Sequence, residues 1–345
     1  MHIADFDYDL PDELIAQEPL GQRDASRMLV VDRATQSWRD SLFVEFPSFL
    51  RQGDLVVLNN TLVFAARLVG ERVPFGGHVE LLLLREIESN TWATLARPAR
   101  RLRVGDRLKF GPDKLLAEVL ECQDDGVRVI RFECEGRLAD ILEEVGETPL
   151  PPYIKRSAGA LEKDRERYQT VYAKSRGAIA APTAGLHFTS GVLDQICAVG
   201  AGVVEITLHI GYGTFEPVRV DEVSHHRVAP EWYSISSEAA TAVNNARSRG
   251  GRVVGIGTTT TRALESAGDQ AGVLSSGSGM AGLTIVPGYQ FRVVDALLTN
   301  FHLPRSSLLM LVSAFAGRDL IVAAYHHAVD MCYRFYSYGD CVLIF

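Results

Sequence analysis

The stretch GGRVVGIGTTTTRALES, residues 250–266, predicts a buried strand that runs directly into a helix. Its apolar run is typical of a strand, and Gly257 permits a tight turn before a helical pattern begins. The same succession recurs after about residue 154, with strands expected at 178–181, 203–210, 252–256 and 292–298 and helices at 190–199, 237–249, 261–267 and 306–316. This alternation predicts an α/β fold with a parallel or mixed sheet and crossover helices.

The N-terminal residues extend this pattern. A helix start is expected at 9–17, and strands are expected at 28–32 and 54–58. After about Phe64 the texture changes to short β-rich runs with turn residues at regular spacing, which indicates a small barrel or sandwich. The prolines at 149–152 form a stiff exit from that module, because proline cannot continue a helix or a central strand.

We therefore expect two domains. An α/β barrel-like main domain is formed by residues 1–64 and 153–345, and it is interrupted by a small antiparallel β-barrel domain at 65–152. The length of 345 residues and the hydrophobic fraction of 47% suit a globular protein with about two cores.

Composition excludes several classes of protein. The formal net charge of -8 argues against a general nucleic-acid coat, but a local basic patch is still able to bind a specific nucleic acid. The acidic N-terminus lacks the pattern of a signal peptide and no apolar stretch is long enough for a membrane span, so a cytoplasmic location is expected. The apolar segment 308–322 is interrupted by Arg318 and Asp319 and predicts two consecutive buried helices. The five widely spaced cysteines are expected to be reduced core thiols.

Four polar and glycine-containing segments each follow the end of an expected strand. They are AAPTAGLHFT (180–189), HIGYGTFEP (209–217), GIGTTTTRALES (255–266) and TNFHLPRSSL (299–308). Ligands of parallel α/β sheets bind at the carboxyl ends of the strands, where loops and helix N-termini converge. The segments therefore predict one composite pocket, with His187, His209, Thr259 and His302 facing a single cavity.

The segment GIGTTTTR has two interpretations. Free backbone N–H groups at a helix start, threonine hydroxyls and the guanidinium of Arg262 would form a phosphate or carboxylate site. The alternative is a threonine-capped helix without a ligand. The third glycine of a dinucleotide fingerprint and the lysine of a P-loop are both missing. In the last segment Ser306 is a plausible helix N-cap, whereas Asn300 and His302 among apolar neighbours require a buried polar contact or a ligand.

The histidines at 187, 209 and 302 suit either metal binding or proton transfer. The chain has no H-E-x-x-H pattern and no His or Cys pair at ligand spacing on one helix face, so we expect no metal site. Imidazole is intrinsically suited to proton transfer near neutral pH, and we favour that role.

Two basic runs border the expected domain junction. One comprises Arg97, Arg100, Arg101, Arg103, Arg107 and Lys109; the other begins at Lys155 and Arg156 and continues to Arg176. A single run of this kind is usually a solvated charged face. Two runs beside one cleft favour binding to a phosphate backbone.

Long motifs carry a resemblance to a known family. They are SRMLVVDR (26–33), GDLVVLNNTLVFAARLVG (53–70), PLPPYIKR (149–156), RYQTVYAKSRGAIAAPTAGLHFT (167–189), HIGYGTFEPVR (209–219), GGRVVGIGTTTTRALES (250–266), PGYQFRVVDALLTNFHLPRSSLLMLVSAFAG (287–317) and YRFYSYGD (333–340). From end to end the chain resembles the S-adenosylmethionine:tRNA ribosyltransferase-isomerases of queuosine synthesis.

The resemblance implies a bacterial transferase that moves the ribosyl group of S-adenosylmethionine onto the aminomethyl-deazaguanine at the wobble position of tRNA. The implied products are epoxyqueuosine in the tRNA, adenine and methionine. The resemblance also implies a similar α/β barrel-like domain with an inserted β-barrel, no metal and no prosthetic group, because S-adenosylmethionine is a co-substrate. We expect a monomer whose partners are S-adenosylmethionine and the precursor tRNA.

Site residues follow from residue type, loop position and this resemblance. His187 or His209 would remove a proton next to the sulfonium, and His302 would protonate departing adenine. The expected substrate-binding residues are Thr183, Phe188, Gly211, Gly213, Thr214, Glu216, Thr258, Thr259, Arg262, Asn300, Arg305, Ser306, Tyr338 and Asp340, the last two by resemblance only. The expected tRNA-binding residues are Arg97, Arg100, Arg101, Arg103, Lys155 and Arg156.

The chain departs from the family pattern at Ala229, Thr261 and Met280. The departures around Ala229 and Met280 support one alternative, a diverged relative that uses S-adenosylmethionine with another acceptor. A second alternative is a non-catalytic tRNA-binding protein that uses the basic barrel, which leaves the pocket unexplained. The glycine- and serine-rich stretch 268–282 is expected to be a mobile loop, serving as a lid.

Overall fold

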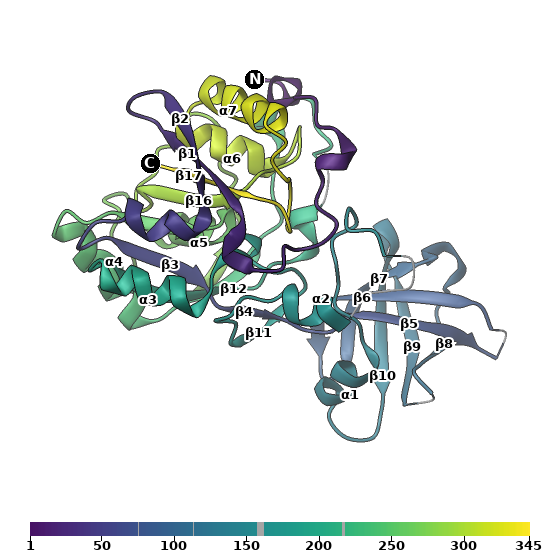
Figure 1. The fold of residues 1–345 in the computed structure, drawn as a ribbon. Helices are drawn as coiled ribbons and strands as arrows, with labels where there is room; N and C mark the ends of the chain where they lie inside the picture. The colour runs from purple at the N-terminus through teal and green to yellow at the C-terminus, as the bar shows by residue number, and fades with distance from the viewer. Residues whose placement is uncertain (75, 113, 157–161, 216–217) are drawn as a thin grey trace.

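The computed structural model describes residues 1–74, 76–112, 114–156, 162–215 and 218–345. Figure 1 shows an α/β part built around a large sheet and, at one end of it, a separate β-barrel. The expected architecture of an α/β fold with an inserted small antiparallel barrel is confirmed. The boundaries at 64/65 and 152/153 stay a prediction.

The large sheet has nine strands in the order β15-β13-β12-β3-β14-β16-β17-β1-β2. Their bounds are β1 Arg27–Asp32, β2 Ser37–Leu42, β3 Leu55–Asn59, β12 Gly202–Leu208, β13 Glu231–Ile235, β14 Val253–Ile256, β15 Gly277–Ala281, β16 Ala296–Asn300 and β17 Cys341–Ile344. Strands β12, β3, β14 and β16 run parallel, and antiparallel strands continue the sheet on both sides. Every residue of β3, β14 and β16 is buried, as parallel strands covered on both faces require.

Helices cover the sheet and start at defined caps. They are α3 Ser190–Ala198, α4 Ser237–Ser248, α5 Thr258–Ala267, α6 Ser307–Ala316 and α7 Arg318–Asp330. The hydroxyls of Thr189, Ser236 and Ser306 accept hydrogen bonds from backbone N–H groups in the first turns of α3, α4 and α6, so each satisfies an orphan donor. Two separate hydrophobic clusters form the core: Val57 contributes to one and its neighbour Val56 to the other, because successive strand residues point to opposite faces.

The barrel is closed in the order β10-β7-β6-β5-β8-β9. Its strands are β5 Arg67–Val73, β6 His78–Glu88, β7 Thr91–Arg97, β8 Arg107–Phe110, β9 Leu115–Cys122 and β10 Val127–Glu133, and helix α1, Leu138–Val145, follows them. Inward-facing side chains such as Leu68, Leu81 and Leu108 give the barrel a hydrophobic cluster of its own. Closure removes the unpaired strand edges that would otherwise invite aggregation.

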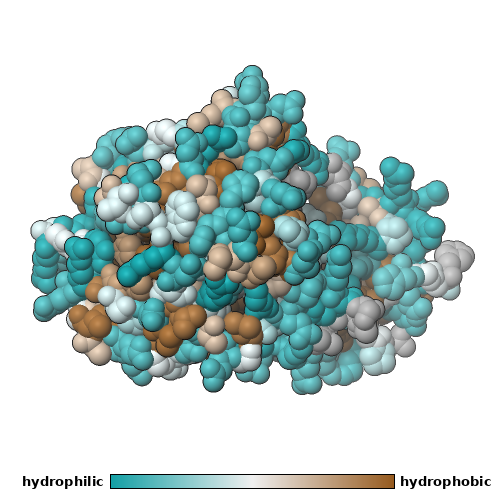
Figure 2. All heavy atoms as spheres, turned by 45° about the horizontal axis from the view of Figure 1, so that its top comes forward, coloured by the Kyte–Doolittle hydropathy of each residue, from teal (hydrophilic) through white to brown (hydrophobic). Residues whose placement is uncertain are grey.

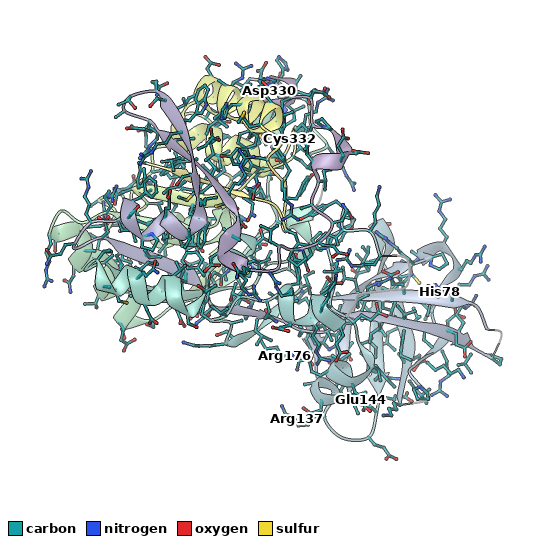
Figure 3. The ribbon with its side chains drawn as sticks, in the orientation of Figure 1. His78, Arg137, Glu144, Arg176, Asp330 and Cys332 are labelled. Atoms are coloured by element: carbon teal, nitrogen blue, oxygen red, sulfur yellow. The ribbon has the colours of Figure 1, made fainter. Side chains whose placement is uncertain are left out.

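Short elements join the two parts. Strand β4, Thr61–Val63, pairs in parallel with β11, Ser175–Ala178. Glu143 of α1 forms ion pairs with Arg165 of α2, Glu162–Arg167, at 2.7 Å and with Arg176 of β11 at 3.1 Å. Figure 3 shows Arg176 at the boundary of the two parts, near α1, where Glu144 and the N-cap residue Arg137 are labelled.

Several expected elements differ in the structure. The segment 9–17 forms only the 3-10 turn Asp12–Leu14, because Pro11 disfavours helical geometry in the residue before it. The strand expected at 178–181 ends at Ala178, and the chain turns into the 3-10 helix Thr183–His187. Helix α5 begins three residues earlier than expected. The stretch 268–282 contains β15, which pairs with β13, so the expectation of a loop throughout is wrong.

The segment 308–322 forms parts of α6 and α7, as expected. No single described helix is long and apolar enough to span a membrane, although α6 and α7 together, bent by 116°, meet the same test of length and composition. All five cysteines are free. Cys341 is buried and Cys134 packs partly buried against the barrel core, whereas Cys122, Cys197 and Cys332 are exposed, so the expectation of core thiols is wrong for these three. Figure 2 shows hydrophilic residues over most of one face, with hydrophobic residues reaching it in scattered patches.

Candidate active site

A cavity of about 580 Å³ lies at the carboxyl ends of β14 and β16. Three of the four segments that follow the expected strands meet there: residues 180–184, 257–259 and 299–308 all line it. Among the described residues of the fourth segment, Ile210 lines it. A volume in this range suits a ligand of small-molecule size, and the composite pocket predicted at the strand ends is therefore present.

The first turn of α5 forms one wall. Gly257 has a φ of +91°, a conformation that favours glycine, and it turns the chain from β14 into the helix. Thr260 and Thr261 donate their hydroxyls to the carbonyls of Ile256 and Gly257 at 2.6 and 3.1 Å. Thr258 and Thr259 line the cavity. The helix start therefore presents hydroxyls and backbone N–H groups to a ligand, as an anion site requires.

Arg262 does not take part in this anion site. Its guanidinium is buried and pairs with Glu231 of β13 at 2.7 Å, and it also donates to the carbonyl of Ala281 at 2.7 Å. Arg262 does not line the cavity, because its guanidinium is held by the buried carboxylate of Glu231, and substrate binding by Arg262 stays a prediction. Glu231 also accepts a hydrogen bond from the backbone of Gly211 at 2.9 Å, so that glycine is occupied as well.

His302 lies on the cavity wall and is buried. Its Nε2 is 3.0 Å from the hydroxyl of Thr299, and its Nδ1 makes no hydrogen bond within the described residues. Burial lowers the pKa of His302 to about 3, because the charged imidazolium loses its hydration. The ring is therefore neutral near pH 7.

Asn300, the last residue of β16, also lines the cavity and is 3% exposed. Its Nδ2 lies 3.1 Å from the carbonyl of Tyr336, 3.4 Å from the carbonyl of Asp340 and 3.3 Å from Nε2 of His187. Its Oδ1 is buried and has no hydrogen-bond partner in the described part of the chain. The polar contact expected at Asn300 is thus made by its NH₂ group, whereas its carbonyl oxygen has no partner among the described residues.

His187 lies behind this wall and does not line the cavity. Its Nδ1 is 3.0 Å from the hydroxyl of Ser26, and its ring packs against Phe43 with centroids 5.3 Å apart. Burial, with the positive charges of Arg334 and Arg23, lowers the pKa of His187 to about 4. The prediction that it faces the cavity is wrong, because the 3-10 helix 183–187 brings Thr183 to the cavity and turns His187 into the core.

His209 is also absent from the cavity wall. Its Nδ1 is 2.8 Å from the hydroxyl of Thr61, and its ring stacks on Trp232 at 4.9 Å. The chain alternates its side chains here, so Ile210 reaches the cavity and His209 points to the other face. Burial lowers the pKa of His209. The prediction of one cavity shared by all four residues holds for Thr259 and His302 only.

The other expected substrate-binding residues divide into two groups. Thr183, Arg305 and Ser306 line the cavity, although Arg305 also pairs with Asp7 and the hydroxyl of Ser306 caps α6. Phe188, Gly213, Tyr338 and Asp340 do not line it. Phe188 is part of the hydrophobic core, and Asp340 accepts hydrogen bonds from the backbones of Arg27 and Arg334 at 2.9 and 2.8 Å. Glu216 and the side chain of Thr214 lie outside the described residues.

A second cavity, of about 380 Å³, lies at the junction of the barrel and the α/β part. Arg97, Lys155 and Arg156 all line it, so it brings together three of the expected tRNA-binding residues from two distant segments. Arg97 and Lys155 are exposed, as are Arg100, Arg101 and Arg103 in the loop after β7. Within the described residues, none of these exposed cations forms an ion pair with a carboxylate.

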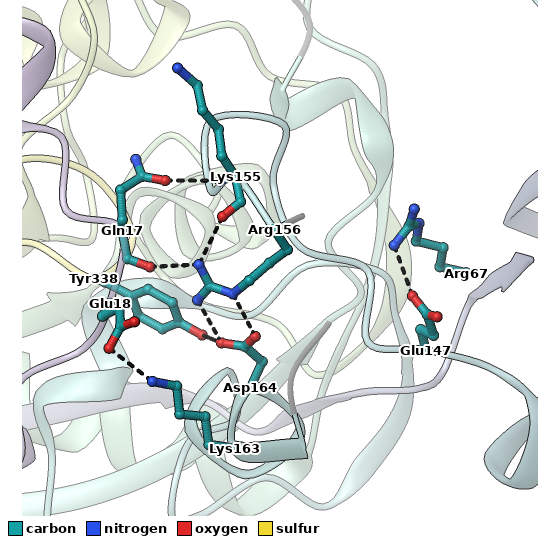
Figure 4. Close-up of polar contacts among 9 residues, drawn as sticks. All are labelled: Gln17, Glu18, Arg67, Glu147, Lys155, Arg156, Lys163, Asp164 and Tyr338. Atoms are coloured by element: carbon teal, nitrogen blue, oxygen red, sulfur yellow. Dashed lines mark hydrogen bonds and ion pairs between the residues drawn. The ribbon is translucent and has the colours of Figure 1, made fainter. Parts of the chain in front are cut away.

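Arg156 differs from these exposed cations. It forms a bidentate ion pair with Asp164, with Nε to Oδ2 and Nη2 to Oδ1 both at 2.9 Å (Figure 4). The hydroxyl of Tyr338 donates to the same carboxylate at 3.2 Å. A buried carboxylate thus already pairs with the guanidinium of Arg156, which favours a structural role, and phosphate binding by Arg156 stays a prediction.

Comparisons with known proteins agree with the resemblance. A family model described as queuosine biosynthesis protein matches residues 3–344. The chain belongs to the queuosine biosynthesis protein family. It is 47% identical over 344 residues to an S-adenosylmethionine:tRNA ribosyltransferase-isomerase of Desulforamulus reducens, covering 100% of both chains. It is also 35% identical to an S-adenosylmethionine tRNA ribosyltransferase of Thermotoga maritima, whose crystal structure it matches with a TM-score of 0.55 over 99% of this chain and 100% of the other.

Sequence reasoning missed several residues that line this cavity, among them two tyrosines. Tyr153 and Tyr336 line it with ring centroids 4.0 Å apart. Tyr336 has a φ of +72°, which is rare for a bulky residue, and its hydroxyl is buried without a hydrogen-bond partner among the described residues. Tyr153 stands next to prolines, which indicated a linker and not a site, and no local sequence pattern predicts the backbone conformation of Tyr336.

No group of three or more His, Cys, Asp or Glu side chains able to hold a metal occurs in the described ranges.

Proposed function

We propose that this protein is an S-adenosylmethionine:tRNA ribosyltransferase-isomerase that acts on the aminomethyl-deazaguanine at the tRNA wobble position. In this proposal the product is epoxyqueuosine in the tRNA, and adenine and methionine are released. The observation that carries the proposal is a ligand-sized cavity at the strand ends of a chain that matches such an enzyme over its whole length. The proposal includes a cytoplasmic monomer without a prosthetic group.

The cavity suits S-adenosylmethionine chemically. Its apolar walls include Ala180, Ile210 and Phe301, which suit the adenine and the methionine side chain. The N-terminus of α5, with the hydroxyls of Thr258 and Thr259, attracts a carboxylate such as that of methionine. The sulfonium itself makes the neighbouring C–H bonds more acidic, which opens the reaction to a base.

His302 is the titratable side chain that we place at the reacting atoms. Adenine develops negative charge as it leaves, and a negative charge beside an imidazole raises its pKa. Burial lowers the pKa of His302, so its ring is neutral in the free protein. In this proposal the ring takes up the proton that is removed next to the sulfonium, because the negative charge developing on adenine raises its pKa, and it then passes that proton to the departing base. His187 and His209 stay predicted bases, but neither lines the cavity, and we assign His187 the positioning of Asn300.

The tRNA would approach at the junction cavity. Arg97 and Lys155 are exposed cations on its wall, from the barrel and from the segment after the linker. Phosphate contacts of this kind position a nucleic acid without reading its bases. Arg100, Arg101 and Arg103 are further exposed cations in the loop that follows β7, close to Arg97 in the sequence.

Adenine release tests the function. The protein is incubated with S-adenosylmethionine and a tRNA that carries the deazaguanine precursor; adenine is measured by chromatography and the wobble nucleoside by mass spectrometry. We expect both adenine and epoxyqueuosine. Absence of adenine would refute the proposal, and adenine formed without the tRNA would favour a diverged relative with another acceptor.

His302→Ala tests the assigned acid. Turnover should fall by about 10²- to 10⁴-fold, the usual contribution of general acid catalysis. His225→Ala is the matched control, because the side chain of His225 is 71% exposed and does not line the cavity. Wild-type turnover by a folded His302→Ala protein would remove His302 from the reaction.

A further inference from the structure

The amide of Asn300 is half satisfied, and its orientation is fixed. The carbonyls of Tyr336 and Asp340 only accept hydrogen bonds, so the group that faces them at 3.1 and 3.4 Å must be the NH₂. Rotating the amide by 180° would bring oxygen against both carbonyls. The Oδ1 atom therefore occupies the remaining side, where no described residue donates to it.

The residues behind Asn300 support this orientation. The carbonyl of Tyr336 is itself held by the backbone N–H of Gly339 at 2.9 Å, and the positive φ of Tyr336 sets its direction. His187 is neutral because burial lowers its pKa to about 4, so its Nε2 is able to accept from the amide while Nδ1–H donates to Ser26. A chain of contacts from Ser26 to Asn300 thus holds one acceptor atom in place.

Leaving a buried acceptor unpaired is costly, and such groups are rare in folded proteins. Asn300 is only 3% exposed, and it lies on the wall of the cavity. A bound ligand that brings a hydrogen-bond donor to this wall would satisfy Oδ1. The ligand must therefore carry an N–H or O–H at this end.

The surroundings of Asn300 indicate which part of the ligand it meets. Tyr153 and Tyr336 form an aromatic wall beside it, which suits a flat heterocycle. The N-terminus of α5, the part of the cavity suited to a carboxylate, is contributed by a different strand, β14. Among the groups of S-adenosylmethionine, the exocyclic amine of adenine joins a flat ring to two N–H donors.

We propose that Asn300 is a specificity-determining residue whose Oδ1 accepts a hydrogen bond from the exocyclic amino group of the adenine of S-adenosylmethionine. This inference rests on the proposed function. Asn300 would bind the adenine half of the substrate, His187 would be the positioning residue that keeps the amide in the required orientation, and purines without an amino group at this position would be rejected.

Ligand analogues test the contact directly. Binding of S-adenosylhomocysteine, a ligand that does not react, is compared by calorimetry with binding of its 6-deamino analogue, which has purine in place of adenine. The wild-type protein should bind the analogue about tenfold to a hundredfold more weakly, since the analogue leaves the acceptor unpaired. In Asn300→Ala and Asn300→Ser the two ligands should bind within about twofold of each other.

Asn59→Ala is the matched control. Asn59 is also the last residue of a parallel strand and is fully buried, but its amide is satisfied by Leu208 and Thr61 at 2.9 to 3.2 Å. The Asn59→Ala substitution should lower the melting temperature but keep the wild-type ratio of the affinities for the two ligands. If Asn300 variants fail to fold, the wild-type ratio alone decides.

The outcomes separate the two proposals. A wild-type protein that binds both ligands equally, or Asn300 variants that keep the wild-type ratio, would overturn the role of Asn300 and leave the proposed function standing. A wild-type protein that binds neither ligand would count against the use of S-adenosylmethionine itself.

Discussion

The buried pair of Arg156 and Asp164 allows a sharp test of structure against sequence. The sequence places Arg156 among phosphate-binding cations, whereas the structure makes it a structural residue. Its side chain is 10% exposed and that of Asp164 is 0% exposed. The guanidinium also donates to the carbonyl of Gln17 at 3.0 Å, and it thereby joins the N-terminal segment, the linker and α2 (Figure 4).

Arg156→Ala removes the cation and leaves the carboxylate of Asp164 in the protein interior. Breaking a buried ion pair in this way costs about 3–5 kcal/mol. That is a large share of the ~5–15 kcal/mol that holds a typical protein folded. At roughly 2–4 °C per kcal/mol for chains of a few hundred residues, the melting temperature should fall by about 6–20 °C.

Lys155→Ala is the control, because Lys155 is the adjacent residue, lines the same cavity and has an exposed side chain. It should change the free energy of unfolding by less than about 0.5 kcal/mol and weaken binding of tRNA. Denaturant titration gives the free energy of unfolding, and filter binding gives the tRNA affinity. An Arg156→Ala protein with wild-type stability and weakened tRNA binding would refute the structural assignment and restore the interpretation from sequence.

Two further predictions concern pH and salt. In the folded protein the pKa of His187 is lowered from 6.5 to about 4, so the unfolded chain binds the extra proton and the free energy of unfolding should fall as pH drops from about 6.5 to 4, by up to about 3 kcal/mol. His187→Gln should show a shallower fall in denaturant titrations across that window, and an identical slope in both proteins would contradict the assignment. Arg97→Ala should weaken tRNA binding and reduce the slope of log K against log salt by about 1. Arg249→Ala, at the exposed C-cap of α4, should change neither the tRNA affinity nor the salt slope; Figure 1 shows α4 on the side of the α/β part away from the barrel. Equal effects of the two substitutions would argue against the junction site.

Much of the fold follows from local patterns. Apolar runs that end in glycine or proline, followed by capped amphipathic stretches, were sufficient to predict β14 with α5 and the capped start of α6. The closely spaced β-rich runs after Phe64 predicted the barrel. The errors fall where local signals are weak or conflict: the segment 9–17 has helical composition but contains Pro11, and the glycine-rich β15 is a strand because β13 offers it a hydrogen-bonding edge.

The candidate site was predictable only in part. Position at a strand end identified Thr183, Thr258, Thr259, Asn300 and His302, all of which line the cavity. The same reasoning included His187 and His209, which do not. It omitted Tyr153 and Tyr336, because they come from a linker and a turn that follow no expected strand of the pattern.

Strands β2, β13, β15 and β17 were not among the expected elements. The sequence by itself determined the alternation of strands and helices in the centre of the sheet, the strand ends where polar residues gather, and the family to which the chain belongs. These depend on neighbouring residues and on motifs that are continuous in the chain. Only the tertiary structure decided which of those polar groups are free to meet a ligand. Arg262 is occupied because Glu231, 31 positions away, lies buried beside it, and Asn300 presents one oxygen because His187, 113 positions away, and two carbonyls hold its other end. Such pairings form when distant segments pack together and exclude water, so no local pattern records them.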